Sequence, residues 1–150
     1  MPKDHVTSIN AVSGYTGGGK KLIAAFEDDQ ADNKTDRNYS LYGLDLEHKH
    51  TEEIRFHAGL DTRPLFVPSV GRFAQGMIVS VPLHLLSLPV AQSLLDVQDL
   101  LSAHYASQQF VTVESLENTS AYTAHLEPER LNGTNHMSSV SYTHLTLPTS

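Results

Sequence analysis

Four glycines within six residues place a sharp turn between two regular elements near the start of the chain. The stretch INAVSGYTGGGKKLIAAFE begins with β-prone residues and ends with Leu22, Ile23 and Phe26, which recur at helical spacing. Glycine adopts the backbone angles of such a turn most readily. The sequence therefore predicts a strand, a glycine turn, and then a helix whose N-terminal end faces the turn.

This order of elements favours an anion at the turn, because backbone N–H groups and the positive end of the helix dipole meet there. Gly14, Gly19 and Lys20 also fit the G-x-x-x-x-G-K spacing of a nucleoside-triphosphate loop. That motif requires a Ser or Thr next, as a magnesium ligand, whereas the next residue here is Lys21. A kinase or ATPase is therefore disfavoured. A glycine turn that binds nothing stays an alternative.

The composition is that of a soluble globular protein with one domain or part of one, since 39% of the 150 residues are hydrophobic and 18% are charged. A net charge of -7 opposes binding to nucleic acid. No apolar run suits a membrane span and no signal peptide is visible, so we expect a cytoplasmic protein without a membrane partner. The absence of cysteine excludes disulfides and a thiol nucleophile within this chain.

A second dense stretch, YGLDLEHKHTEEIRFHAGL, combines histidines with carboxylates. Thr51 is expected to cap a short helix, with His48 and His50 in the extended segment before it and both imidazoles on one side. Three interpretations compete for His48, His50, Glu53 and His57: a metal site, an acid–base site, or ordinary hydrogen bonds at a helix entry. The spacing alone does not decide among them, because H-x-H followed by Glu has no fixed ligand geometry.

The rest of the chain predicts further strands and helices. EDDQADNKTDRNYS is expected to be a surface loop, and TRPLFVPSVGRFAQG an ordered crossing segment punctuated by proline and glycine. MIVSVPL predicts a buried strand with Pro82 at a sheet edge, residues 90–105 an amphipathic helix, and QFVTVESL another strand. With too few strand–helix–strand units for a doubly wound sheet, these elements predict an α+β fold with a mixed sheet.

The last residues differ in kind from those before them. Ser141 to Thr149 match, residue for residue, the translation of a transposon end used to prepare sequencing libraries. We therefore expect a partial domain at residues 1–139 and a tail of laboratory origin at 140–150 that takes no part in the fold. The reading frame is accordingly expected to be cut short.

Several motifs, in order, resemble those of the shorter type of N-acetyl-gamma-glutamyl-phosphate reductase: NAVSGYTGGGKK, YGLDLEHKHTEEI, PLFVPSVGRFAQGMIVSVPL and GTN. The resemblance spans roughly Val6 to Met137. It implies a glyceraldehyde-3-phosphate-dehydrogenase-like C-terminal domain with a largely antiparallel sheet covered by helices. It also implies an intact enzyme that forms a homo-oligomer and uses NADPH to reduce an acyl phosphate to an aldehyde in arginine biosynthesis.

The same resemblance implies roles for residues of the glycine turn. Ser13, Gly14 and Gly17 are expected to contact NADP. Lys20 or Lys21 is expected to balance the charge of the substrate's phosphate. The anion favoured at the turn would then belong to an acyl-phosphate substrate rather than to ATP.

In the histidine stretch, the resemblance implies an active site lined by the pattern Y-G…H-x-H-x-x-E. His50 is expected to be the acid–base residue, with Glu53 orienting it, His48 contacting substrate and Tyr42 lining the site. The choice between the two histidines stays open. His57 lies outside the pattern, and because the chemistry needs no Lewis acid, no metal site is expected.

Two parts of the family pattern are missing from this chain. The nucleophilic cysteine and the glycine fingerprint of the dinucleotide-binding domain would both lie before residue 1, so the isolated chain is expected to be inactive. Two other interpretations stay open. A dehydrogenase of the aspartate-semialdehyde type shares the domain plan, and a non-catalytic module could bind a phosphorylated ligand at the glycine turn.

Overall fold

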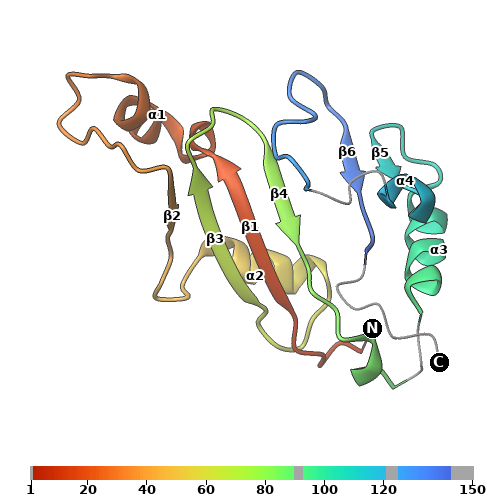
Figure 1. The fold of residues 1–150 in the computed structure, drawn as a ribbon. Coiled ribbons are helices and arrows are strands. Elements are labelled where there is room, and N and C mark those ends of the chain that lie inside the picture. The colour runs from red at the N-terminus through yellow and green to blue at the C-terminus, as the bar shows by residue number, and fades with distance from the viewer. Residues whose placement is uncertain (1, 90–92, 121–124, 143–150) are drawn as a thin grey trace, which may run out of the picture. The chain divides into compact units, whose positions relative to one another are not determined.

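The computed structural model describes residues 2–89, 93–120 and 125–142, which form two compact units (Figure 1). The first unit comprises Met1–Leu83 and Glu127–Asn132, and the second comprises His84–Leu126 and Gly133–Ser150. Each unit has a sheet of its own. None of the described helices has the length and hydropathy needed to cross a membrane.

The first unit is built on a four-stranded sheet in the order β2-β3-β1-β4. β1 and β3 run parallel, while β1–β4 and β2–β3 are antiparallel pairs. This confirms the predicted α+β class with a mixed, largely antiparallel sheet. The elements in chain order are β1 (Ser8–Gly14), the 3-10 helix η1 (Tyr15–Gly18), α1 (Gly19–Glu27), β2 (Tyr39–Leu41), α2 (Lys49–His57), β3 (Leu65–Gly71) and β4 (Met77–Ser80).

The segment expected to be an ordered crossing segment contains β3, an inner strand of the sheet. Pro68 argues against a strand here, because proline lacks the backbone N–H that a β-ladder needs. The carbonyl of Pro68 accepts a hydrogen bond from the N–H of Tyr42 at 3.2 Å, just past Leu41, where the β2–β3 pairing ends. The missing donor therefore falls at the end of the neighbouring strand, where its loss costs little.

Two further sequence expectations for this sheet are wrong in part. Tyr39 and Ser40, expected in a polar loop, belong to β2. The strand expected to be buried, β4, lies at the sheet edge, with Met77 and Val79 59% and 53% exposed. Its edge position is the one that Pro82 predicts, and a strand with a single neighbour is more exposed than an inner one.

The core of the first unit lies on one face of the sheet. Ile9 pairs with Phe66 and Ser13 pairs with Val70 in the parallel register, so all four side chains share that face. Ile9, Phe66 and Val70 are buried. Helix α2 lies behind the sheet in Figure 1, and its ring contacts with Phe66 identify this as the same face.

The second unit pairs one long helix with a small sheet. A capping box between Ser93 and Asp96 starts the helix, and Gln98 donates to the carbonyl of Glu114 at 2.6 Å. Strand β5 confirms the strand predicted in QFVTVESL. The elements are the 3-10 helix η2 (Leu85–Ser87), α3 (Leu94–Tyr105), β5 (Val111–Val113), α4 (Leu116–Ser120) and β6 (Met137–Ser139), with β5 and β6 parallel.

Parts of two sequence predictions fall outside the described residues. The helix predicted from Val90 is seen from Leu94 onward, and residues 90–92 are not described. The predicted tail begins just after β6, and its residues 143–150 are not described either. The laboratory origin of 140–150 therefore stays a prediction.

Candidate functional site

The glycine turn is tied to the β3–β4 connection through its own backbone. Three consecutive N–H groups donate to carbonyl oxygens of that connection: Gly14 to Gly76 at 3.0 Å, Tyr15 to Phe73 at 3.0 Å and Thr16 to Ala74 at 3.2 Å. The Thr16 hydroxyl donates to the same Ala74 oxygen at 2.6 Å. These three N–H groups are therefore engaged within the protein rather than offered to an anion.

The glycines of the turn serve different purposes. A Cβ on Gly14 would lie 2.7 Å from the carbonyl carbon of Ala74 and 2.8 Å from the nitrogen of Gln75, so this glycine permits close packing of the two backbones. At Gly17 the nearest atom to a Cβ is the Ser13 hydroxyl oxygen, 4.0 Å away. The exposed residues of the turn are Gly17 to Gly19, and Ser13 lies beside Gly17.

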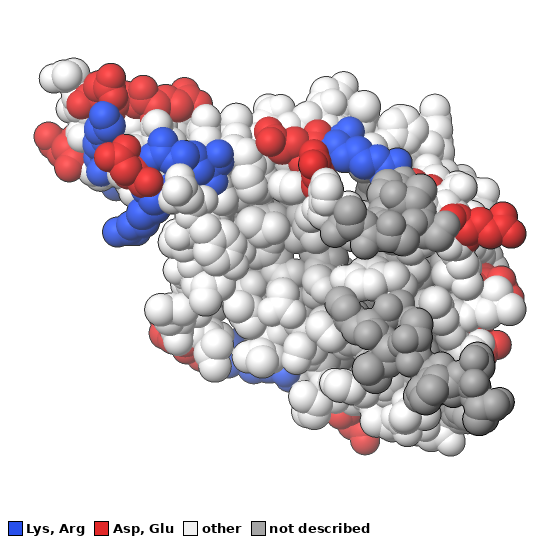
Figure 2. All heavy atoms as spheres, in the orientation of Figure 1, with Lys and Arg blue, Asp and Glu red and all other residues white. Residues whose placement is uncertain are grey.

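Lys20 and Lys21 lie in the first turn of α1, and both are exposed. Neither ammonium group forms an ion pair within the described part of the chain. Figure 2 shows acidic and basic side chains interleaved over α1 and the loop that follows it, rather than a basic patch. Contact between one of these lysines and a phosphate stays a prediction.

The histidine pair lies at the start of α2, and the cap of this helix is not the predicted one. Thr51 is 3% exposed inside the helix, while His48 is the N-cap and its Nδ1 accepts the N–H of His50 at 3.2 Å. His48 is extended, and His50 already belongs to the first helical turn. An imidazole nitrogen thus satisfies a free helix N–H in the way that Ser, Asp or Asn side chains usually do.

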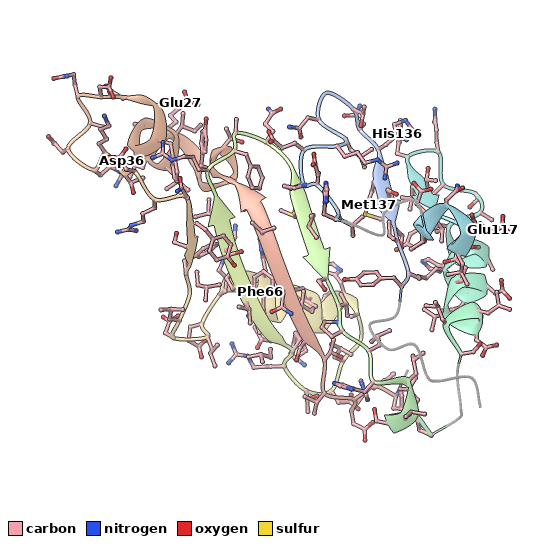
Figure 3. All side chains as sticks on the ribbon, in the orientation of Figure 1. Glu27, Asp36, Phe66, Glu117, His136 and Met137 are labelled. Atoms are coloured by element: carbon pink, nitrogen blue, oxygen red, sulfur yellow. The ribbon has the colours of Figure 1, made fainter. Side chains whose placement is uncertain are left out.

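Aromatic contacts hold the two imidazoles together on β3. The ring centroids of His48 and His50 are 4.7 Å apart, and those of His48 and Phe66 are 5.2 Å apart. Tyr42 adds a contact to His48 at 5.6 Å. Phe66, labelled in Figure 3, therefore contacts both imidazoles, those of His48 and His50.

The environment of His48 favours its neutral form. Burial lowers the pKa of His48, and the nearby charges of His50 and Lys49 lower it further, against smaller opposing effects from Glu53 and Asp45. Because Nδ1 accepts a hydrogen bond, the neutral ring carries its proton on Nε2. His48 can therefore donate a hydrogen bond from Nε2 without being charged.

His50 has the carboxylate partner that the pattern predicts. Glu53 Oε2 lies 3.7 Å from His50 Nε2, one helical turn away. Both side chains are about half exposed, at 47% and 58%. The distance suits an ion pair when the imidazole is protonated, and it leaves Nδ1 of His50 as the nitrogen that faces away from Glu53.

Ser13, which leads into the glycine turn, lies on the same sheet face as Phe66 and the histidine pair. The histidines contact Phe66, which pairs with Ile9, and Ser13 lies four residues further along β1 on the same face. Four residues of strand span about 13 Å at about 3.3 Å per residue. The backbone N–H of Tyr42 bonds to Pro68 between these two levels. The two predicted halves of the site therefore lie at different levels along the same, largely buried face of the sheet.

Other features of the chain do not add to this site. His57, at the end of α2, contacts the ring of Phe56 with centroids 5.2 Å apart. Across residues 2–89, 93–120 and 125–142, no three His, Asp or Glu side chains are grouped to hold a metal ion. Two open cavities of about 270 and 480 Å³ belong to the second unit, around α3, and include none of the predicted site residues.

Sequence reasoning missed Phe66 as part of the site. Phe66 supports both imidazoles and is 8% exposed. The alternation of Phe66, Pro68 and Val70 carries the signal of a strand with one buried face. Pro68 concealed that alternation.

Comparisons with known proteins agree with this fold. A family described as "Semialdehyde dehydrogenase, dimerisation domain" matches residues 1–144. The chain belongs to this family. Proteins named N-acetyl-gamma-glutamyl-phosphate reductase from Brucella anthropi and Brucella ovis are each 51% identical to it over 133 residues, or 89% of this chain. These findings confirm the resemblance stated from the motifs.

The match covers only part of those relatives. The semialdehyde dehydrogenase dimerisation domain described here spans 42% of the length of the Brucella anthropi protein and 43% of that of the Brucella ovis protein.

Proposed function

We propose that this domain carries the acid–base half of the active site of an N-acetyl-gamma-glutamyl-phosphate reductase. The reaction is the NADPH-dependent reduction of N-acetyl-glutamyl phosphate to the semialdehyde, with release of phosphate, in arginine biosynthesis. The observation that carries the proposal is the pair of imidazoles held on Phe66, with Glu53 beside His50. The identity to reductases of that name supports the choice of substrate.

In this proposal His50 transfers the proton. His50 takes the proton of a thiol, and the resulting thiolate attacks the acyl carbon. The bond from this carbon to sulfur forms as its bond to the phosphate oxygen breaks and phosphate leaves. When bound, NADPH supplies the hydride that reduces this carbon. As the carbon–sulfur bond then breaks, His50 returns the proton to the sulfur. Glu53 lies at Nε2, so transfer occurs at Nδ1, and the charged imidazole is stabilised by that carboxylate.

The neighbouring residues position the reactants in the same proposal. Neutral His48 donates from Nε2 to the substrate, and Tyr42 orients the His48 ring through their contact. Ser13 and Gly17 hold the cofactor's polar edge at the turn, whereas Gly14 contributes through packing. Lys20 or Lys21 balances the charge of the departing phosphate.

The nucleophile must come from outside this domain. The chain has no cysteine, so it cannot form the covalent acyl intermediate by itself. The isolated domain is therefore inactive in this proposal. NADPH-dependent turnover by the purified 150-residue chain would contradict it.

We further propose that the intact protein is a cytoplasmic homo-oligomer. The face of the sheet opposite Phe66 carries apolar side chains that are nearly half exposed or more, namely Tyr39 at 58%, Leu41 at 48% and Leu65 at 45%. Exposed apolar side chains that share one sheet face are typical of a surface covered by another protein. The family description, a dimerisation domain, supports self-association.

A chimaeric enzyme tests the proposed function. The matched 133 residues of this domain replace their counterpart in the Brucella anthropi reductase, which supplies the parts outside the match. The chimaera should reduce N-acetyl-glutamyl phosphate with NADPH. In that background His50→Asn should lower kcat by roughly 10²- to 10⁴-fold, the usual contribution of general acid–base catalysis.

His57→Asn is the matched control, since His57 lies on the same helix away from the imidazole pair, and it should leave kcat unchanged. A folded chimaera without activity would contradict the proposed function. Equal activity of the His50→Asn and unsubstituted chimaeras would contradict the role of His50.

A further inference from the structure

The loop that leads into α2 has a strained backbone. Leu46 has φ of 63°, in the left-handed region that side chains other than glycine rarely adopt, and Gly43 has φ of 62°. Leu46 is 53% exposed, so its own side chain adds little packing that would favour this conformation. Contacts elsewhere must therefore hold the loop in the conformation that places His48 at the helix entry.

Arg63 provides such contacts on both sides of His48. Its two terminal nitrogens donate to the two oxygens of Glu47, each at 3.2 Å, and its Nε lies 2.9 Å from Glu52 Oε1. Glu47 directly precedes His48, and Glu52 lies in the first turn of α2. One planar guanidinium thus joins the strained loop to the helix that follows it.

The segment that carries Arg63 is itself anchored. Leu60 is 6% exposed, and the N–H of Asp61 donates to the carbonyl of Lys3 at 2.8 Å. On the other side, the N–H of Leu65 donates to the carbonyl of Thr7 at 2.9 Å, where β3 begins beside β1. Arg63 therefore ties the loop to a fixed part of the first unit.

We propose that Arg63 is a positioning residue, which holds the Glu47–Glu52 segment so that His48 caps α2 and both imidazoles rest on Phe66. The inference rests on the proposed function for the importance of the two imidazoles. Arg63 itself acts through Glu47 and Glu52 and does not contact the reacting atoms. All three side chains are exposed, so these two ion pairs stabilise the domain weakly, and salt weakens them further.

Nuclear magnetic resonance on the full 150-residue chain tests this role. The amide N–H groups of His50 and Thr51 bond to His48 Nδ1 and the His48 carbonyl, so their hydrogen exchange reports the helix entry. In Arg63→Gln, exchange at these two amides should accelerate roughly three- to tenfold, the size expected when exposed ion pairs are lost. The ¹⁵N shifts of His48 should move from the Nε2–H tautomer toward a mixture.

Three comparisons keep the experiment specific. Glu47→Gln should reproduce the effect, and Arg63→Lys should lie between, because lysine keeps the charge but not the paired donors. Arg55→Gln removes the same charge from Glu52 without touching Glu47, and it should leave exchange and tautomer unchanged.

The inference is overturned by either of two results. One is that Arg63→Gln leaves unchanged both the exchange of the His50 and Thr51 amides and the ¹⁵N shifts of His48. The other is that it accelerates exchange equally at the helix entry and in the β1–β3 ladder, which would mean that Arg63 only stabilises the fold. Because these readouts need no turnover, an inactive chimaera would remove the proposed function without deciding this point.

Discussion

The glycine turn follows the end of β1 and the histidine segment packs on Phe66 of the neighbouring strand β3, yet the two regions are held in different ways. Between β1 and α1, three consecutive backbone N–H groups and one hydroxyl bond to the β3–β4 connection. At the start of α2, the fixing contacts are an imidazole cap, tilted and edge-on ring contacts, and exposed ion pairs around Arg63. Backbone hydrogen bonds hold the turn, whereas side-chain contacts hold the histidine segment.

This difference suits the different tasks proposed for the two regions. Backbone hydrogen bonds change little with pH or salt, so the turn is suited to fixing the position of Ser13. Imidazoles and exposed ion pairs respond to both, so the histidine segment is suited to moving a proton. Because different contacts hold the two regions, substitutions in one region should leave the other unchanged.

The largest effect is expected at Phe66, beneath the histidine segment. Phe66→Ala removes a buried ring and should lower the free energy of unfolding by about 3–5 kcal/mol, measured by urea denaturation followed by circular dichroism. Phe66→Leu keeps most of the volume and should cost less than about 1.5 kcal/mol. The leucine variant should still move the ¹⁵N shifts of both imidazoles, because the ring contacts are lost.

The same variants should spare the glycine turn. In Phe66→Leu, hydrogen exchange at the N–H groups of Gly14, Tyr15 and Thr16 should match that of the unsubstituted chain. Faster exchange there would show that the two regions are coupled through the sheet. The contrast between them would then be wrong.

The next largest effect is expected at Gly14, in the turn. Gly14→Ala places a Cβ against the backbone of Ala74 and Gln75 and should cost about 1–3 kcal/mol of unfolding free energy, as overpacking typically does. Gly17→Ala is the matched control, since its Cβ would meet only the Ser13 hydroxyl at 4.0 Å. The control should be neutral or slightly stabilising.

Both alanine variants should retain the His48 tautomer, since the histidine segment is held separately. Equal stability of the Gly14→Ala and Gly17→Ala proteins would contradict the packing role of Gly14. The purpose of the first glycine would then have to be sought in ligand binding.

Local patterns predicted much of what the structure shows. The strand, glycine turn and helix from Ser8 to Glu27 follow from spacing and glycine content, and so does the closeness of His48, His50 and Glu53. These features depend on neighbours within a few residues of each other. Sequence reasoning is strongest over that range.

The errors come from contacts between distant residues. The N–H groups of the turn are engaged by a segment some 58 residues away, as the bond from Thr16 to Ala74 shows, and no local pattern reveals such a partner. Pro68 argued against a strand at β3, and no local pattern reveals that its lost donor falls where the neighbouring strand β2 ends. Thr51 was predicted to cap α2, but it is buried inside the helix, and His48 is the cap.

The smallest effect expected is the pH dependence of the His48 cap. Burial lowers the pKa of His48 in the folded protein, below the value of about 6.5 for an unfolded histidine. Between these two values the unfolded chain binds more protons than the folded one, so stability rises with pH. The contribution of His48 is complete above about pH 6.5 and is lost as pH falls through the folded pKa. Urea denaturation at several pH values measures this slope.

His48→Asn separates the cap from the titration, because an asparagine oxygen can accept the His50 N–H and carries no titrating proton. The variant should keep the helix entry and lose the part of the slope due to His48. After correction for the slower intrinsic exchange at low pH, acidification of the unsubstituted chain should lower the protection factors of His50 and Thr51 before those of Gly14, Tyr15 and Thr16. The N–H groups of these three residues bond to backbone carbonyls that do not titrate. Simultaneous loss of protection in both regions would show that His48 titrates only with global unfolding. The side-chain contacts at the start of α2 would then be no more sensitive to pH than the backbone hydrogen bonds of the turn.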